Sequence, residues 1–315
     1  MLSFQVLGLF LAGKDIAIDF FQNINCVYGF LYGPLLFMYS KSITEKDFKL
    51  KPQYLYHFAL SLIVLTTSLI FGKHIVQNYI YILYPLHILT YLILCFLELA
   101  KYKKAIKDNY SKLESLSLNW LKWVLIIFSF TTALDVIQST LFFLNIELIP
   151  TENFVFILIL LIINILYFKG FMSSNNLIGL KEEDIVLSQS MSSRKRLNTT
   201  LKENQIIVNK LEDHIKETRT FENPDLTITT LSQELGIPKR TLSELINDYY
   251  DKNFVDFINT HRIIEAKRRF MNPKDNKETI LEVMYSVGFN SKSSFNTAFK
   301  RKTGLTPTEF KSKYK

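Results

Sequence analysis

The polar side chains with the clearest chemistry lie in two short stretches of the last third of the sequence, KRTLSELIN (239–247) and SKSSFNTAFKRK (291–302). Arg and Lys can hydrogen-bond guanine, Asn can pair with adenine, and Glu can accept from a cytosine amino group. Neighbouring lysines and arginines suit phosphates, which position a protein without specifying sequence. Both stretches therefore predict contact with double-stranded DNA.

The sequence shows no arrangement that is typical of catalysis. It has no Gly-rich phosphate loop and no HExxH motif, and its five histidines are scattered. Cys26 and Cys95 both lie inside apolar runs. We interpret them as small buried hydrophobic residues, so neither a disulfide framework nor a metal site is predicted. We expect a protein that is not an enzyme and that needs no cofactor.

Helical periodicity indicates how the two polar stretches are positioned. An apolar stripe from Leu226 to Leu235 ends at Gly236, and Pro238 suits the first position of the next helix. A second stripe, from Ile280 to Val287, ends at Gly288 before the next short helix. Two short helices joined by a tight turn are the signal of a helix-turn-helix unit, and it occurs twice. The predicted inner residues are Leu242, Leu245, Ile246 and Tyr249 in the first unit and Phe295 and Phe299 in the second.

A longer helix over 253–271 links the two units and would set their spacing on one face of DNA. Its predicted core residues are Phe254, Phe257, Ile258, Ile263, Ala266 and Phe270. The stretches LGIPKRTLSELIN, NFVDFINTHRIIEAK and GFNSKSSFNTAFKRKTGLTPTEF then carry a specific resemblance. Residues 225–314 resemble the AraC/XylS-type DNA-binding domain over almost all of its length. The resemblance implies a transcriptional regulator.

Outward side chains in the first turns of each recognition helix reach base edges, and the base-contacting positions of the family fall on the same residues. The predicted base contacts are Arg240, Ser243, Glu244, Lys292, Ser293, Ser294, Asn296 and Thr297. Glu244 is an acid near phosphates, so we expect the first helix to bind more weakly than the second.

Four further cations are predicted phosphate contacts: Lys239, Lys300, Arg301 and Lys302. The alternative is that they form a solvated basic face. In the linking helix, a salt bridge and a DNA contact are equally open for Arg262. Arg269 stands where an apolar residue is usual, so it either extends to the surface or loosens the packing.

The first 171 residues have a different character. They contain six apolar segments, at 2–22, 24–40, 54–71, 78–99, 119–144 and 154–171. A run of about 18 to 20 apolar residues is long enough to cross the hydrocarbon core of a bilayer as a helix. The sequence therefore predicts an all-α protein, with a polytopic transmembrane helical bundle ahead of the soluble DNA-binding domain.

Lysines give this bundle an orientation. Loops 41–53 and 100–118 hold nine lysines between them, whereas the alternate loops 72–77 and 145–153 hold one. Because cytoplasmic loops collect Lys and Arg, the last span is expected to leave the membrane on the cytoplasmic side, at Lys169. The prediction is a multi-pass protein of the bacterial inner (cytoplasmic) membrane with a cytoplasmic C-terminal domain.

The predicted domains are a transmembrane sensor or anchor domain (1–171), a cytoplasmic connector (172–223) and the DNA-binding domain (224–315). In the connector, Ile207, Leu211 and Ile215 recur at four-residue steps and predict an amphipathic helix. It would pack on the next domain or pair with a second copy. The N-terminal half is also similar to a group of membrane-embedded AraC-type regulators, which implies one further span upstream of Met1 and hence an N-terminally truncated chain.

Polar residues inside spans are expensive and often functional. Asp135 and His87 are the candidate sensing residues, and interhelical hydrogen bonding that only holds the bundle together is the alternative reading.

The predicted function is a sequence-specific regulator of promoter DNA that responds to an unknown small-molecule or protein signal at the membrane. Membrane lipid is the second expected partner, and a homodimer is left open. The alternatives are a transporter or membrane enzyme with a regulatory DNA-binding tail, and a passive membrane tether for DNA. The signal, the target genes and the direction of regulation are not encoded in any motif.

Overall fold

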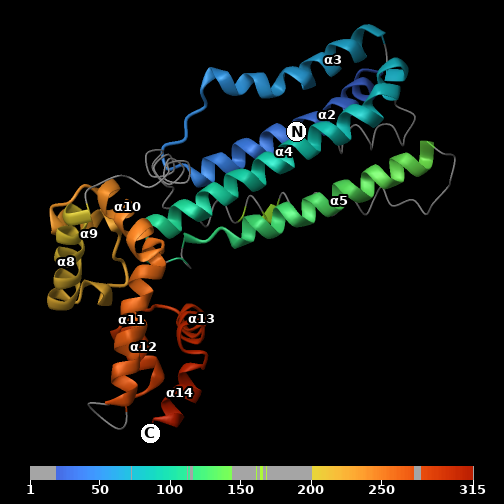
Figure 1. Ribbon diagram of the computed structural model, residues 1–315. Coiled ribbons are helices and arrows are strands. Elements are labelled where there is room, and N and C mark those ends of the chain that lie inside the picture. The colour runs from blue at the N-terminus through green and yellow to red at the C-terminus, as the bar shows by residue number, and fades with distance from the viewer. Residues whose placement is uncertain are drawn as a thin grey trace. The chain divides into compact units, whose positions relative to one another are not determined.

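The computed structural model describes residues 19–71, 73–111, 113, 116–143, 161, 164–165, 168, 201–272 and 278–314. In these ranges every regular element is a helix, as predicted (Figure 1). The chain divides into two compact units. The first contains residues 1–100 and 118–179, and the second contains 101–117 together with 180–315.

The first unit is made of long apolar helices. Its described elements are α2 (Asp19–Thr44), η1 (Pro52–Phe58), α3 (Ala59–Phe71), most of α4 (Lys73–Asn109) and α5 (Asn119–Phe143). Helices α2 and α3 pack together through Val27, Phe30 and Val64. The Ser61 hydroxyl donates to the Phe30 carbonyl across this contact (3.0 Å). Many large apolar side chains remain exposed, among them Leu62, Ile70, Leu89, Trp123 and Phe130.

Three helices in the described ranges are long and apolar enough to cross a membrane: Pro52–Phe71, Leu83–Asn109 and Asn119–Gln138. They coincide with the predicted segments 54–71, 78–99 and 119–144. The predicted segment 24–40 forms most of α2, which does not meet the same criterion. Most of the segments 2–22 and 154–171, and the exit at Lys169, lie outside the described residues.

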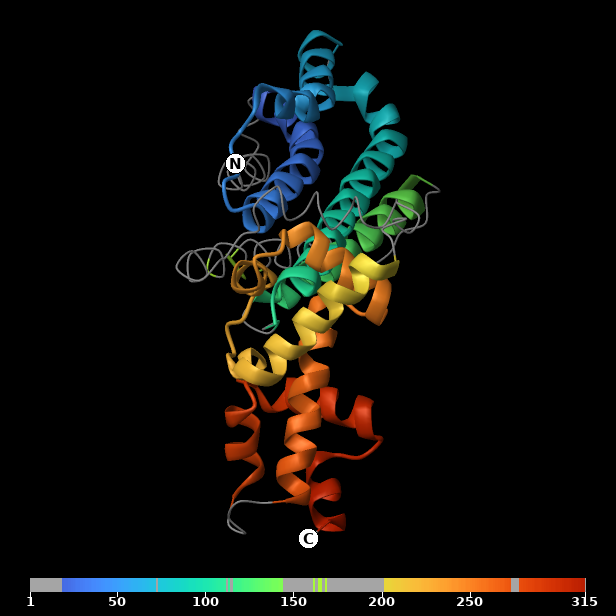
Figure 2. The same cartoon turned by 60° about the vertical axis from the view of Figure 1, so that its left-hand side comes forward.

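The second unit is built around one long helix, α11 (Phe254–Met271). Its other elements are α8 (Leu201–Thr218), η3 (Thr220–Glu222), α9 (Ile228–Leu235), α10 (Lys239–Tyr250), α12 (Ile280–Ser286), α13 (Lys292–Thr303) and α14 (Pro307–Lys313). Helix α11 contacts η3, α10, α12, α13 and α14, and Figure 2 shows it, in orange, as the long helix of this part of the chain. The linking helix predicted for 253–271 is thereby confirmed.

The first core of this unit joins α8 to the first helix-turn-helix. Leu211 and Ile215 are fully buried in one cluster with Leu231, Leu242 and Phe257. The predicted amphipathic helix thus exists, and its apolar face packs on the next domain, which was one of its two expected partners. The burial of two aliphatic side chains explains the choice, since each contributes about 1.5–3 kcal/mol when removed from water.

One inner residue was predicted wrongly. Tyr249 is 54% exposed, and Tyr250 takes the inward position instead. The Tyr250 ring lies 4.7 Å from that of Phe257, and its hydroxyl donates to Glu212 of α8 (2.8 Å). The partner on α8 decides this, because it offers a hydrogen bond that the helical period of α10 alone does not reveal.

The second core is aromatic, and the Phe299 ring is in contact with the rings of Phe270, Phe295 and Phe310. The ends of its helices are capped as the sequence requires. Thr279 and Glu282 form a capping box on α12, and Thr306 and Glu309 form one on α14. These caps fix where each short helix starts, which a helix of seven residues could not do through propensity alone.

Candidate nucleic-acid interface

The first helix-turn-helix unit begins at Thr227, whose hydroxyl caps α9. Gly236 ends α9 with φ 63°, a left-handed conformation that favours glycine. Pro238 caps α10 rather than opening it, one residue from the predicted place. These two residues set the tight turn that carries the chain from α9 into the predicted recognition helix.

The predicted contacts of α10 do not all face outward. Arg240 is exposed, and its Nε donates to the Glu244 carboxylate at 2.9 Å. Ser243 is only 8% exposed and lies among the buried residues of α10. Among the predicted DNA contacts of α10, the cations at the surface are thus one arginine that is already paired with an acid and the half-buried Lys239.

Helix α13 presents a fuller polar row. Ser291 caps the helix by accepting from the Ser294 N–H (3.4 Å). Lys292, Ser293, Asn296 and Thr297 are all exposed, and Ser294 is half-buried. Residues four positions apart share one side of a helix, so the pairs Lys292/Asn296 and Ser293/Thr297 lie side by side and form one outward row. Opposite that row, Phe295 and Phe299 lie in the aromatic core.

The end of α13 is strongly basic. Lys300, Arg301 and Lys302 are exposed in its last turn, where cations also complement the helix dipole. Arg301 pairs with Asp256 of α11 (2.5 Å). Burial and the nearby Lys302 together lower the pKa of Lys252, a cation that the sequence analysis missed. Its position directly after α10 gave no sign that it would lie beside the end of α13.

Arg262 does neither of the two things expected of it. It is 2% exposed, and its guanidinium donates to the carbonyls of Phe221 (2.7 Å) and Asn223 (2.8 Å) and to the Ser111 hydroxyl (3.2 Å). Burial lowers its pKa to about 10. The reason is that η3 packs against α11, and the long side chain of Arg262 supplies the hydrogen-bond donor that the carbonyls of residues 221 and 223 accept.

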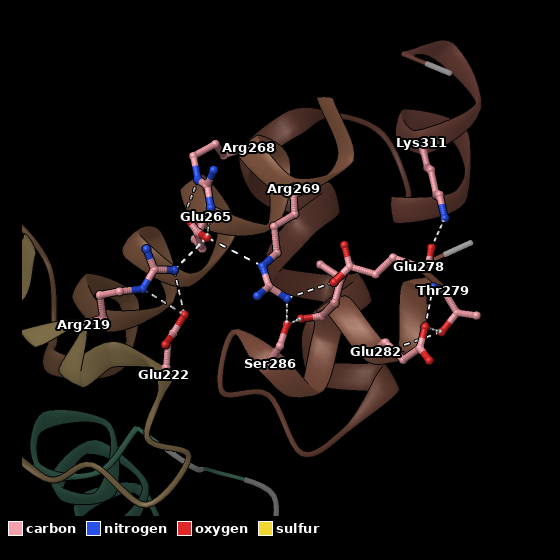
Figure 3. Close-up of polar contacts among 11 residues, drawn as sticks. Arg219, Glu222, Glu265, Arg268, Arg269, Glu278, Thr279, Glu282, Ser286 and Lys311 are labelled. Atoms are coloured by element: carbon pink, nitrogen blue, oxygen red, sulfur yellow. Dashed lines mark hydrogen bonds and ion pairs between the residues drawn. The ribbon is translucent and has the colours of Figure 1, made fainter. Parts of the chain in front are cut away.

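Arg269 extends into an ionic cluster rather than loosening the core (Figure 3). It donates to Glu278 at 3.0 Å and to the Ser286 hydroxyl, and its Nε lies 3.6 Å from Glu265. Glu265 is the centre of the cluster, since it also binds Arg219 (2.6 Å) and Arg268 (2.6 Å). Hydrogen bonds from Arg268 and then Arg219 lower the pKa of Glu265 to about 2, against the opposing effect of burial.

The predicted sensing residues lie in the compact unit of apolar helices, residues 1–100 and 118–179. His87 Nε2 lies 2.9 Å from the Phe30 carbonyl oxygen, and its ring packs against Phe30 and Tyr91. This arrangement suits the alternative reading, in which the residue holds helices together. His57, which the sequence analysis passed over, makes a similar contact to the Tyr91 hydroxyl (2.9 Å). Asp135 belongs to α5, but its side chain lies outside the described residues.

A family model described as a helix-turn-helix domain matches residues 231–313. The C-terminal part of the chain is thus similar to a helix-turn-helix domain. Its double unit and linking helix agree with the AraC-like organisation expected from the sequence.

The relatives match part of the chain. An uncharacterised HTH-type transcriptional regulator of Staphylococcus aureus is 28% identical over 141 residues, which are 44% of this chain and 18% of that protein. A second uncharacterised regulator of this type, from Pseudoalteromonas carrageenovora, is 31% identical over 87 residues, covering 28% of this chain and 49% of the other. Histidine kinase P4 of Formosa agariphila is 30% identical over 92 residues, covering 29% of this chain and 6% of the kinase. No solved structure matches.

These findings support a DNA-binding regulator. The chain spans less than a fifth of the length of the Staphylococcus aureus relatives. Among the residues that the structure describes, no group of three or more His, Cys, Asp or Glu side chains is placed to hold a metal ion.

Proposed function

We propose that this chain is a membrane-anchored, sequence-specific transcriptional regulator that binds promoter DNA through α10 and α13. The carrying observation is the outward row Lys292, Ser293, Asn296 and Thr297 on α13, opposite a fully packed aromatic face. A row that mixes amide, hydroxyl and ammonium groups can distinguish base edges, whereas lysines alone would bind phosphate without discrimination.

The two recognition helices contribute unequally in this proposal. Asn296 would pair with adenine and Lys292 with guanine, while Ser293, Ser294 and Thr297 supply shorter hydrogen-bonding groups. On α10, Arg240 must leave Glu244 before it can reach a base, and Ser243 is buried. The first helix-turn-helix unit is therefore expected to contribute less to base recognition than the second. Contacts to phosphates would come from Lys239, Lys300, Arg301 and Lys302.

Anchoring in the inner membrane is supported by the three apolar helices and by the alternation of lysine-rich loops. The same pattern assigns the C-terminal domain to the cytoplasm, where promoter DNA is. The signal would act in or on the bundle, with His87 and Asp135 as candidate positions. Lipid is then a permanent partner, and a second copy of the chain is a further candidate partner.

The test is a selection of genomic DNA fragments by the detergent-solubilised full chain at physiological salt. Wild-type protein is compared with Asn296→Ala and Lys292→Ala, and with Lys313→Ala as a control that removes the same charge from an exposed site on α14. We expect enrichment of a few promoter regions, abolished or altered with Asn296→Ala and Lys292→Ala and kept with Lys313→Ala. Removing one base-reading side chain should reduce affinity by about 1–3 kcal/mol.

Equal recovery of all fragments by all four proteins would overturn sequence specificity and leave a membrane tether for DNA. Orientation is tested separately, with single cysteines placed at Lys46 and Lys73 in a chain without Cys26 and Cys95. In intact cells, labelling by a membrane-impermeant thiol reagent is expected at position 73 and not at position 46. The opposite pattern would overturn the cytoplasmic location.

A further inference from the structure

The loop that follows α4 belongs to the same compact unit as the helix-turn-helix domain. Tyr110 forms an isolated antiparallel bridge with Thr227, directly before α9. The Ser111 N–H donates to the Leu226 carbonyl (3.1 Å), and the Ser111 hydroxyl donates to the Pro224 carbonyl (3.2 Å). Ser111 is buried by these contacts. The loop is thus hydrogen-bonded to the domain through main chain and side chain alike.

Arg262 fastens this contact to the rest of the domain. Its Nη2 reaches both the Ser111 hydroxyl and the Asn223 carbonyl, and its guanidinium lies 5.5 Å from the centre of the Phe289 ring. Next to Phe289, Gly288 (φ 92°) lies so close to segment 221–222 that a Cβ there would be 2.7 Å from the Phe221 carbonyl oxygen. One buried arginine of the linking helix therefore contacts the loop, the segment before the first helix-turn-helix unit and the turn of the second helix-turn-helix unit.

The loop also lies close to the start of α13, the helix that carries the predicted base contacts Lys292, Ser293, Asn296 and Thr297. Ser111 and Leu113 line a cavity of about 210 Å³ that is also lined by Asn290, Ser291 and Ser294. Ser291 caps α13, and Ser294 lies in its first turn. DNA that engages the N-terminal turn of α13 brings its backbone close to this end of the helix. A docked loop and a DNA backbone would therefore compete for the space beside the first turn of α13.

We propose that residues 110, 111 and 113 form an autoinhibitory latch on the DNA-binding domain, and that a change in α4 releases it. This inference rests on the proposed DNA binding by α13. The latch is connected to the membrane by chain continuity alone, since Leu83–Asn109 is one of the three helices able to span it and the loop follows directly. A shift of α4 would break the bridge at Tyr110 and the bonds of Ser111, and the approach to Ser294 would open.

The latch can be locked with a disulfide. Facing residues of an antiparallel pair have Cα atoms about 4.5–5.5 Å apart, within the range that a disulfide spans. The variant is Tyr110→Cys with Thr227→Cys in a full-length chain whose Cys26 and Cys95 are alanine. Thr227 also caps α9, so its replacement affects the helix. The oxidised protein is therefore compared with the same variant after reduction, because both forms carry the same substitutions. The two single-cysteine variants control for the oxidising treatment.

The measurement is recovery of a random-sequence duplex DNA library by the purified full chain, before and after oxidation. We expect a cross-link to form without DNA, recovery to fall at least tenfold in the cross-linked protein, and reduction to restore it. Ser111→Ala should raise the recovery by the uncross-linked chain severalfold, because it removes two of the hydrogen bonds of the latch.

Failure of the cross-link to form would overturn the docking. Equal recovery by the oxidised and reduced protein would overturn autoinhibition while leaving the proposed function intact. No recovery by the reduced protein or by the single-cysteine controls would count against the proposed function, since in those proteins only hydrogen bonds hold the loop and it can leave the domain.

Discussion

Glu265 offers a direct test of how the DNA-binding domain is stabilised, through the change Glu265→Gln. Its side chain is 8% exposed, and its two oxygens accept from Arg219 and twice from Arg268 (2.6–2.7 Å). Three arginines lie within 4 Å of this carboxylate. The variant keeps the shape of the side chain but leaves those guanidinium groups without their shared negative charge (Figure 3).

The size of the effect follows from the pKa of Glu265. A pKa of about 2 in the folded chain, against an ordinary value of 4.5, corresponds to about 3 kcal/mol at most. Arg219 and Arg268 are 39% and 50% exposed, so solvent screening reduces this to about 1–2 kcal/mol. Because the folded pKa is lowered, the stabilisation is complete above pH 4.5 and is lost as the pH falls towards 2.

Hydrogen exchange of the α11 amides in the full chain measures this contribution locally. At pH 7, Glu265→Gln is expected to speed exchange in α11 by roughly 5- to 30-fold, the equivalent of about 1–2 kcal/mol. Between pH 4.5 and 2 the difference in protection between wild type and variant should shrink. Asp248→Asn, at an exposed carboxylate of α10, is the matched control and should change little. Unchanged exchange at pH 7, or a difference that persists undiminished at pH 2, would refute the reasoning.

Three further changes probe other contacts. In thermal melts, Gly288→Ala should lower the free energy of unfolding by about 3 kcal/mol or more, because its Cβ would meet two carbonyl oxygens at 2.7 Å. Gly236→Ala, whose Cβ would meet no atom within 4 Å, should lower it by about 1 kcal/mol. Arg262→Met removes the donor to the Phe221 and Asn223 carbonyls, so a loss of about 3 kcal/mol and faster amide exchange over 219–227 are expected, and unchanged exchange would contradict that role. Glu244→Gln frees Arg240 and removes an acid near phosphates; fluorescence anisotropy on a selected duplex should show roughly threefold tighter binding, and weaker binding would show that the acid itself contacts DNA.

Much of the helix-turn-helix domain could be predicted because its signals are local. Gly236 and Gly288 mark helix ends by a backbone conformation that other residues adopt only with strain, and both have positive φ in the structure. The core residues Phe254, Phe257 and Phe295 follow from helical periodicity, because an amphipathic helix must bury its apolar side. The capping residues of the short helices are equally local.

The roles of charged residues could not be predicted in this way. Arg262 and Arg269 are the same residue type on the same helix, yet one donates to the carbonyls of residues 221 and 223 and the other joins a cluster of ion pairs. Ser243 has the type and position of a base contact, but neighbouring side chains cover it. The partners of these residues come from η3, α12 and the loop after α4, which are distant in the sequence.

The sequence by itself determined that the chain is helical, that its apolar half precedes a basic half, and that two turn-linked helix pairs flank a longer helix. Those properties depend on periodicity, glycine and charge, which act over a few neighbouring residues. Only the tertiary structure decided that Tyr250 rather than Tyr249 faces inward, that α8 closes the first core, and that Ser111 is bound by Arg262. The physical reason is that buried polar groups form hydrogen bonds with residues that can be distant in the sequence. A local sequence pattern does not indicate which distant residues the fold brings close.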